Sequence, residues 1–202
     1  MAHAESYIGL VEVGVGLLPG WGGSKEMLLR NAERMKAPNG HQMGGPMAWT
    51  GKAFETISLA KVGTSAQESM SLLYLRKGQD TVVMNRERLL FDAKQKALEL
   101  AKDYKAPDPE EAVIKLPGAS GRLALSMAVE GFHKSGKATD HDLVVSDAVA
   151  AVLTGGDTDP TEVVTEDEIL KLERDEFMRL IRTKDSLARI EHMLETGKPL
   201  RN

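Results

Sequence analysis

The spacing of apolar positions predicts a chain built mainly from helices. Between Glu87 and Tyr104, aliphatic and small residues recur every three or four positions, with charged residues between them. This is the strongest helical pattern in the chain, and it predicts an amphipathic helix with one apolar face. Related patterns predict further helices over residues 24–35, 48–61, 66–75, 122–135, 141–153, 166–183 and 186–195.

Capping signals mark where several of these helices begin. Ser24, Ser65 and Thr165 stand where an N-cap is expected, because a hydroxyl oxygen there can accept a free backbone N–H of the first turn. Glu68 and Glu168 lie three residues after their caps and complete predicted capping boxes. Ser65 and Thr165 are therefore interpreted as caps and not as nucleophiles.

Only two short stretches suggest strands, residues 7–13 and 81–84. The first has no earlier strand with which to pair, so its edges are expected to need partners. A connector rich in proline and glycine covers residues 105–121. The predicted organisation is a mixed segment at 1–104, followed by a helical extension at 105–202.

The most informative segment runs from Glu12 to Gly23. One carboxylate stands before a loop with five glycines and one proline among residues 13–23. The loop leads into a helix, whose first N–H groups are expected to point, unpaired, at whatever lies in front of them. A lone acid beside such a loop suits proton transfer to or from a substrate that carries partial negative charge.

Composition narrows the function classes. The chain has 202 residues, 42% of them hydrophobic, which is enough for a buried core. A net charge of −4 gives no reason to expect nucleic acid as a partner. The absence of cysteine excludes disulfides and thiolate metal sites. No apolar run reaches the length of a membrane span, and the N-terminus lacks signal-peptide features, so a cytoplasmic location is expected.

The remaining polar residues carry weaker signals. No pair of histidines has the spacing of a helical metal site, so all five are expected to be solvated, and no metal is predicted. The charges between Glu162 and Arg182 are interpreted as a solvated helix face. The five histidines are His3, His41, His133, His141 and His192.

The loop also carries a family resemblance. The stretch from Tyr7 to Gly23 has Glu12, then three residues, then Gly-Leu-Leu-Pro-Gly-Trp-Gly-Gly and a helix, and it resembles the crotonase superfamily of enoyl-CoA hydratases and isomerases. Residues 63–69 resemble the capped helix that follows in that family, and 81–84 its next strand. The resemblance implies that this chain is the C-terminal helical portion of an α/β crotonase-like fold, with one or two residual strands.

The tail narrows the resemblance. Residues 188–202 resemble the end of bacterial multifunctional 3-hydroxyacyl-CoA dehydrogenases, in which the crotonase-like part comes last. This implies a fatty-acid β-oxidation enzyme that hydrates trans-2-enoyl-CoA. The substrate would be an acyl-CoA thioester, and NAD would bind only in a dehydrogenase part. Residues 1–202 contain no dinucleotide fingerprint, and no cofactor is predicted in this chain.

The resemblance assigns roles to five residues of the loop. Glu12 matches the acid–base glutamate, and Gly20 matches a glycine whose N–H can contact the reacting water. Leu17, Pro19 and Trp21 would line the acyl pocket, although Trp21 stands where the family has a small residue. The family's oxyanion N–H donors, its second Glu and most of its coenzyme A site correspond to sequence before this segment.

Two alternatives remain open. The enzyme could be an enoyl-CoA isomerase that uses Glu12 alone, or the chain could be a truncated, non-catalytic helical interaction module. Late helices of the family pack on neighbouring subunits and can touch the coenzyme, which makes Phe177 and Lys184 candidates for that role. Because the apolar faces lack partners here, a homo-oligomer or a marginally stable chain is expected.

Overall fold

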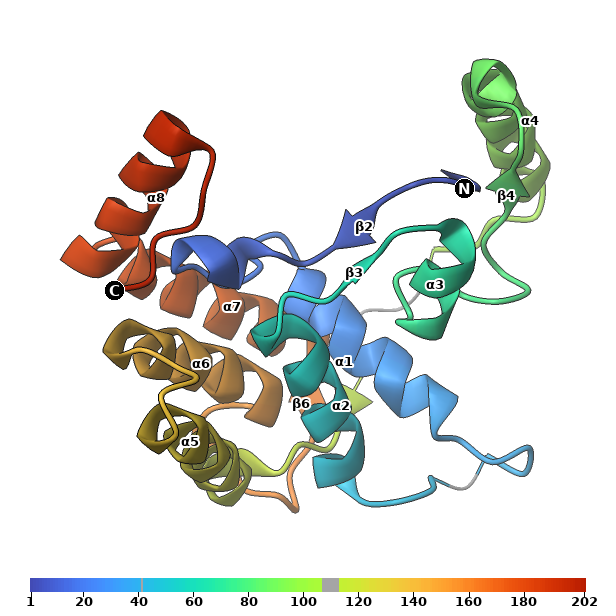
Figure 1. Cartoon of the computed structure of the whole chain (residues 1–202). Coiled ribbons are helices and arrows are strands. Elements are labelled where there is room, and N and C mark those ends of the chain that lie inside the picture. The colour runs from blue at the N-terminus through green and yellow to red at the C-terminus, as the bar shows by residue number, and fades with distance from the viewer. Residues whose placement is uncertain (41, 107–112) are drawn as a thin grey trace. The chain divides into compact units, whose positions relative to one another are not determined.

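A computed structural model describes residues 1–40, 42–106 and 113–202 (Figure 1). His41 and part of the predicted connector, residues 107–112, lie outside the described residues. The described chain is predominantly helical, as predicted. Its α-helices are α1 (Gly23–Arg34), α2 (Pro46–Ser58), α3 (Ala66–Ser71), α4 (Leu89–Ala101), α5 (Gly118–Lys134), α6 (Asp140–Thr154), α7 (Glu166–Leu180) and α8 (Lys184–Thr196).

The strands of the described residues are each two residues long and form three separate pairs. The predicted strand over residues 7–13 is reduced to its second and third residues, because residues 12–15 form a 3₁₀ helix, and it has a partner after all. The pairs are β1 (Ala2–His3) parallel to β4 (Val82–Val83), β2 (Ile8–Gly9) antiparallel to β3 (Val62–Gly63), and β5 (Val113–Ile114) antiparallel to β6 (Val164–Thr165).

The chain divides into two compact units, each made of two separate segments. The first unit contains Met1–Gly9 and Val62–Glu111, and the second contains Leu10–Lys61 and Ala112–Asn202. The domain boundary at residue 104 stays a prediction.

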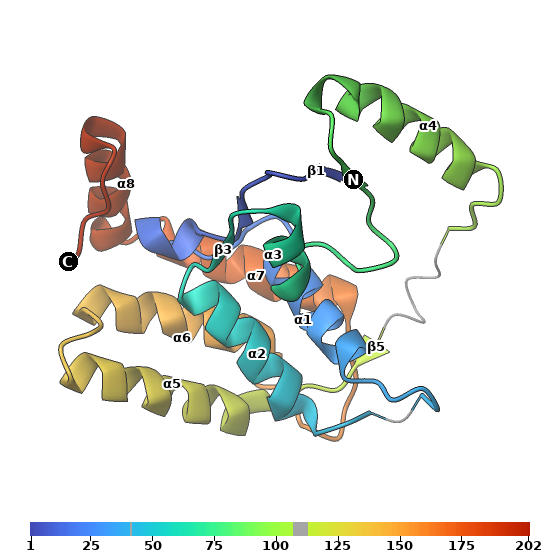
Figure 2. The ribbon, with the colours of Figure 1, turned by 45° about the vertical axis from the view of Figure 1, so that its right-hand side comes forward.

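Helix α6 is the centre of the second unit. Thr139 caps it in a full capping box with Asp142, and Gly155 ends it in a left-handed conformation. It buries nine of its fifteen residues, including the fully buried Leu153. Helix α5 lies along one side of α6, and α1, α2 and α7 also pack on it (Figures 1 and 2). These helices position the loop that carries Glu12.

The first unit has a much smaller core. Ala2, Ala66 and Leu75 form its buried cluster. Ser65 caps α3 by accepting the Glu68 N–H, as predicted. The predicted capping box is wrong in one detail, because the Glu68 carboxylate accepts from the N–H and hydroxyl of the preceding threonine instead.

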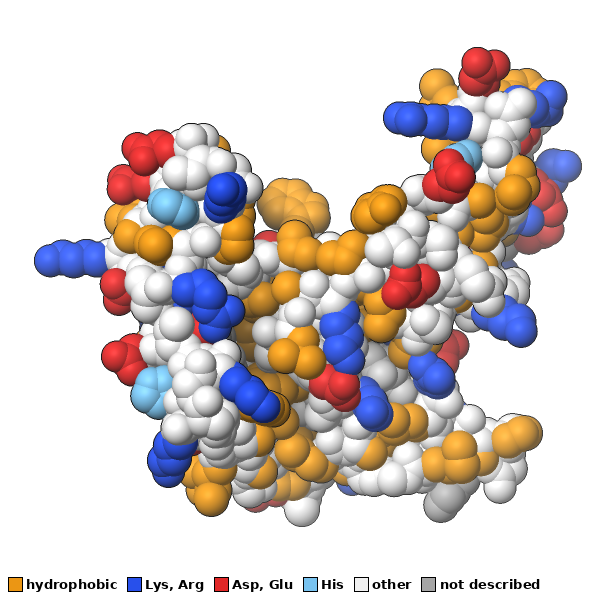
Figure 3. Space-filling view, viewed as in Figure 1, with side chains coloured by type: hydrophobic (Ala, Val, Ile, Leu, Met, Phe, Trp, Pro, Cys, Tyr) orange, Lys and Arg blue, Asp and Glu red, His pale blue; other side chains and the backbone are white. Residues whose placement is uncertain are grey.

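Helix α4, the helix with the clearest predicted apolar face, has no buried residue on that face. It begins after a short 3₁₀ helix, η2 (Arg86–Arg88), and has no buried residue. Leu90 is 83% exposed, and Phe91 and Leu98 are each 55% exposed. Apolar side chains are visible among the charged ones on this helix (Figure 3). The apolar pattern predicted the helix correctly, but it could not predict whether another element packs on the apolar face.

No helix of the described residues combines the length and apolar character that a membrane crossing requires.

Candidate active site

Glu12 begins a short 3₁₀ helix, η1 (Glu12–Val15), at the start of the glycine loop. Its carbonyl oxygen accepts the Leu17 N–H at 3.1 Å and closes the turn. Within the described residues, its Oε2 atom is buried and has no hydrogen-bond partner. Such an oxygen costs free energy, so it calls for an explanation, and a catalytic role is one. This local geometry makes Glu12 the best candidate for proton transfer.

A buried glutamate from another helix occupies the end of the loop. Glu173 of α7 is 1% exposed. Its two carboxylate oxygens accept the Gly22 N–H at 2.5 Å and the Ser24 N–H at 2.9 Å. These are N–H groups at the start of α1, where a negative charge also meets the favourable end of the helix dipole. The expectation that this helix end points unpaired donors at a ligand is therefore wrong for these two groups.

Glu173 also replaces the predicted helix cap. Gly22 is the N-cap of α1, and a glycine has no side chain that could accept a hydrogen bond there. Ser24 lies inside the first turn, is fully buried, and its hydroxyl has no partner among the described residues. The prediction of Ser24 as N-cap is wrong because the carboxylate of α7 supplies the acceptor.

A second connection holds the middle of the loop. The Ser186 hydroxyl of α8 donates to the Gly16 carbonyl at 2.5 Å, and a ring nitrogen of His141, from α6, lies 2.9 Å from that hydroxyl. A Cβ at Gly16 would lie only 2.9 Å from the Ser186 hydroxyl, and Gly16 has a φ of +77°. Both facts require glycine there. Glycine at position 16 therefore allows the loop to pack directly on α8.

His141 is buried, contrary to the expectation that it is solvated. It is 3% exposed. Burial lowers its pKa, and the charge of Arg189 lowers it further, against the opposing charges of Asp185 and Asp142. His141 and Ser186 resemble parts of a nucleophilic pair, but Ser186 is fully buried and its hydroxyl proton is engaged by Gly16. They hold the loop in place and have no access to a substrate.

The other described histidines carry no metal site. His133 pairs with Asp140 at 2.7 Å, and His3 contacts the carbonyl of Met84. Across residues 1–40, 42–106 and 113–202, no group of three or more His, Asp or Glu side chains could hold a metal ion.

The loop residues between Glu12 and α1 differ widely in exposure. Pro19 is buried and Leu17 is half-buried, whereas Gly20 is exposed and Trp21 is 100% exposed. A Cβ at Gly20 would lie 2.6 Å from the ring of Phe177, so that ring lies against the glycine backbone. The assignment of Leu17, Pro19 and Trp21 to an acyl pocket stays a prediction.

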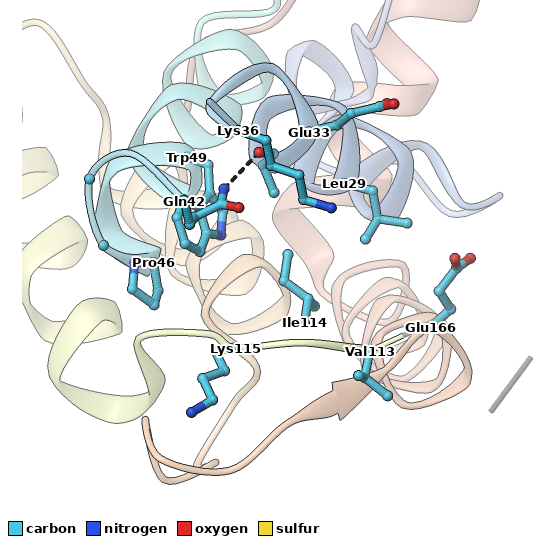
Figure 4. Close-up of a pocket in the computed structure, with 13 residues that line it drawn as sticks. Leu29, Glu33, Lys36, Gln42, Pro46, Trp49, Val113, Ile114, Lys115 and Glu166 are labelled. Atoms are coloured by element: carbon cyan, nitrogen blue, oxygen red, sulfur yellow. Dashed lines mark hydrogen bonds between the residues drawn. The ribbon is translucent and has the colours of Figure 1, made fainter. Parts of the chain in front are cut away.

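A separate cavity lies elsewhere in the second unit. It has a volume of about 760 Å³ and lies between α1, the start of α2 and the β5–β6 pair. Figure 4 shows Trp49, Leu29 and Ile114 around it, with the Lys36 side chain reaching into it. None of the predicted site residues lines this cavity, so it is not part of the Glu12 site.

Sequence reasoning missed Glu173, Ser186 and His141. Glu173 lies within a charged stretch that looked like a solvated face, and Ser186 lies at a helix start. One signal was present: Glu173 is four residues after Ile169 and seven before Leu180, both fully buried. It therefore lies near the apolar stripe of α7, where a carboxylate needs a partner.

Comparison with known proteins finds a bacterial relative that matches this chain over its whole length. The chain is 41% identical over 201 residues to the "Probable 3-hydroxyacyl-CoA dehydrogenase" of Bacillus subtilis (strain 168). The match covers 100% of this chain but only 24% of that protein, so the chain spans about a quarter of the relative's length. No family model matches the chain.

Proposed function

We propose that this chain is part of a fatty-acid β-oxidation enzyme of the 3-hydroxyacyl-CoA dehydrogenase and enoyl-CoA hydratase type. In this proposal the intact protein hydrates trans-2-enoyl-CoA, and the chain is the C-terminal helical portion of a crotonase-like fold. The observation that carries it is Glu12, with a buried, unpaired oxygen, directly before the Pro19-Gly20 loop. The similarity to a probable 3-hydroxyacyl-CoA dehydrogenase supports fatty-acid oxidation as the broader setting.

Glu12 would act as a general acid–base group. In the forward reaction its carboxylate takes a proton from water as the resulting hydroxide adds to the β-carbon. The protonated Glu12 then gives that proton to the α-carbon, so the double bond is lost and the carboxylate is restored. The exposed backbone of Gly20 would help to place the water. The negative charge that develops on the thioester oxygen needs N–H donors, which the proposal assigns to sequence outside this chain.

The proposal assigns substrate contacts to Leu17, Pro19 and Trp21. Because Trp21 is fully exposed, it has no cover from its own chain among the described residues. An acyl chain or a neighbouring subunit would supply that cover. The protein would work as a homo-oligomer in the cytoplasm, with an acyl-CoA thioester as its substrate.

The proposal places no NAD site at the start of α1. A dinucleotide phosphate needs free N–H groups at a helix that follows a glycine loop. The glycine loop here leads into α1, but Glu173 already occupies the N–H groups of Gly22 and Ser24 with a negative charge. The proposal therefore assigns any hydride transfer to another part of the intact protein.

The decisive measurement is hydration of crotonyl-CoA by the longest natural polypeptide that contains these 202 residues. Glu12→Gln keeps the size of the side chain but removes its base. It should lower kcat by at least about 100-fold, the range expected for loss of a general acid–base group. Glu5→Gln, a change of the same kind at an exposed residue, serves as the control and should leave kcat unchanged.

Two other outcomes would favour the alternatives. Conversion of a 3-enoyl-CoA to the 2-enoyl isomer, lost in Glu12→Gln and without net addition of water, would identify an isomerase. A polypeptide that binds partners but turns over neither substrate would identify the non-catalytic interaction module. Hydration that survives Glu12→Gln would contradict the role of Glu12 directly.

A further inference from the structure

Helix α7 contacts the Glu12 loop at several points. Glu173 accepts two N–H groups at the start of α1, and the Phe177 ring lies against Gly20. About two turns earlier on the same helix, Glu166 pairs with Lys25 in the first turn of α1. All these contacts lie within the second unit. One face of α7 is therefore matched to the loop and to the helix that follows it.

The two ends of the loop are also in contact with each other. A Cβ at Gly23 would lie 2.7 Å from the Leu10 side chain and 2.9 Å from Pro19, so these groups pack closely. Leu10 stands two residues before Glu12. A shift of the start of α1 would therefore move the segment that carries Glu12, because the close packing leaves no free space to absorb it.

Capping α1 does not by itself require a buried carboxylate from a distant helix. Many helices are capped by a hydroxyl or carboxylate from their own first residues, as α6, α7 and α8 are here. The start of α1 is instead held by a fully buried charge from a residue 151 positions away. Burying a carboxylate is costly unless it is well hydrogen-bonded. A glycine N-cap with a remote carboxylate ties the loop to α7, which a local cap cannot do.

We infer that Glu173 is a positioning residue for Glu12: by fixing the start of α1, it holds the glycine loop in the arrangement that proton transfer needs. The inference rests on the proposed function, because it concerns the same site. Its physical basis is that a misplacement of a general base by about 1 Å can cost on the order of 100-fold in rate. Ser186 and His141 hold the middle of the loop in the same way, through the Gly16 carbonyl.

Two variants test the inference in the polypeptide used for crotonyl-CoA hydration. Glu173→Gln keeps the shape of the side chain but presents an amide donor to one of the two N–H groups. Glu173→Asp keeps the charge but withdraws it by one methylene, and it is the variant expected to fold most readily. The control is Glu168→Gln, which makes the same chemical change on the same helix at a carboxylate that caps α7 itself.

The expected signature is a loss of kcat that loss of folded protein does not explain. Glu173→Gln and Glu173→Asp should each lower kcat about 10- to 100-fold, with KM within about twofold. In the 202-residue chain, the Gly22 and Ser24 amides should exchange with solvent at least about 10-fold faster. Glu168→Gln should leave kcat and both amides unchanged.

The outcomes separate this inference from the proposed function. If the wild-type polypeptide does not hydrate crotonyl-CoA, both fail. If hydration depends on Glu12 but both Glu173 variants keep the wild-type kcat per folded molecule, only the positioning role is overturned. The positioning role is also overturned if kcat falls only in proportion to the folded fraction, because a purely structural role would give that result.

Discussion

Helix α6 of the second unit and helix α4 of the first are both regular helices, yet their surroundings are opposite. Helix α6 buries nine of fifteen residues, whereas α4 buries none of thirteen. Their patterns would have suggested the reverse, because α4 has the clearer amphipathic stripe. An apolar stripe shows that a helix could bury one face, and only a matching surface decides whether it does.

The same contrast separates the two units. The second unit encloses a continuous set of buried side chains around α6, including Val149, Leu153 and Ile169. The first unit relies on a small cluster around Ala66 and on paired strands of only two residues. Short strands and a small cluster give little independent stability. The first unit is therefore expected to open more readily than the second.

The largest expected difference comes from one substitution made in both helices. Leu153→Ala in α6 should lower the free energy of unfolding by about 2–5 kcal/mol, because a fully buried leucine leaves a cavity. Leu98→Ala in α4 should change it by less than about 0.5 kcal/mol. Amide hydrogen exchange measures both units, and Trp49 fluorescence in a Trp21→Phe background reports on the second unit. A cost at Leu98 as large as at Leu153 would show that α4 is covered in solution.

A smaller, pH-dependent effect is expected from His141. Its folded-state pKa is lowered, so the folded chain binds this proton more weakly than the unfolded chain does. The stabilisation from neutral His141 is complete above about pH 6.5 and is lost as the pH falls.

The test compares wild type with His141→Gln, which cannot titrate. Wild type should lose more of its free energy of unfolding than the variant does between about pH 7 and pH 5. Arg189, Asp185 and Asp142 act electrostatically on the ring and are the same in both proteins, so they cancel in the comparison. Parallel pH curves for the two proteins would contradict the buried neutral state of His141.

Loss of a helix cap should change the free energy of unfolding by an amount similar to or smaller than the His141 effect, and only one unit should be affected. Ser65 caps α3 in the first unit, and Thr165 caps α7 in the second. Replacing either by alanine should cost about 1 kcal/mol. Amide exchange should accelerate only in the unit that carries the change. Acceleration in both units from either variant would show that they unfold together.

The smallest effect on stability, but a clear one on assembly, is expected from the exposed face of α4. If that face contributes to the proposed homo-oligomer, Leu98→Lys should shift the sedimenting species towards monomer while changing the unfolding free energy by less than about 0.5 kcal/mol. Leu123→Lys, at a 62% exposed leucine of α5, is the matched control. A monomeric wild-type chain would contradict the oligomer.

Several features could be predicted from local sequence. The helices begin and end within a few residues of their predicted positions, because hydroxyl caps such as Thr165 and the apolar spacing act within one or two turns. The strand at residues 7–13 was predicted too long. Its second half forms η1, and the chance to pair with β3 depended on residues more than fifty positions away.

The candidate site also has a part that local sequence predicted and a part that it did not. The sequence alone pointed to Glu12 and the glycine loop, because that chemistry lies in one continuous segment. It misplaced the cap at Ser24 and the environment of His141, because the groups that decide both, Glu173 and Ser186, come from other helices. No local pattern contains a contact between residues 151 positions apart.

By itself, then, the sequence determined the helical character of this protein, the helix ends and the segment that carries Glu12, since those depend on neighbours along the chain. The tertiary structure alone decided which apolar faces are buried and what holds the loop. Burial and the pairing of a buried charge depend on which surfaces meet in space. Helix α4 has an apolar stripe and no buried residue, whereas Glu173 is a charged residue that is buried.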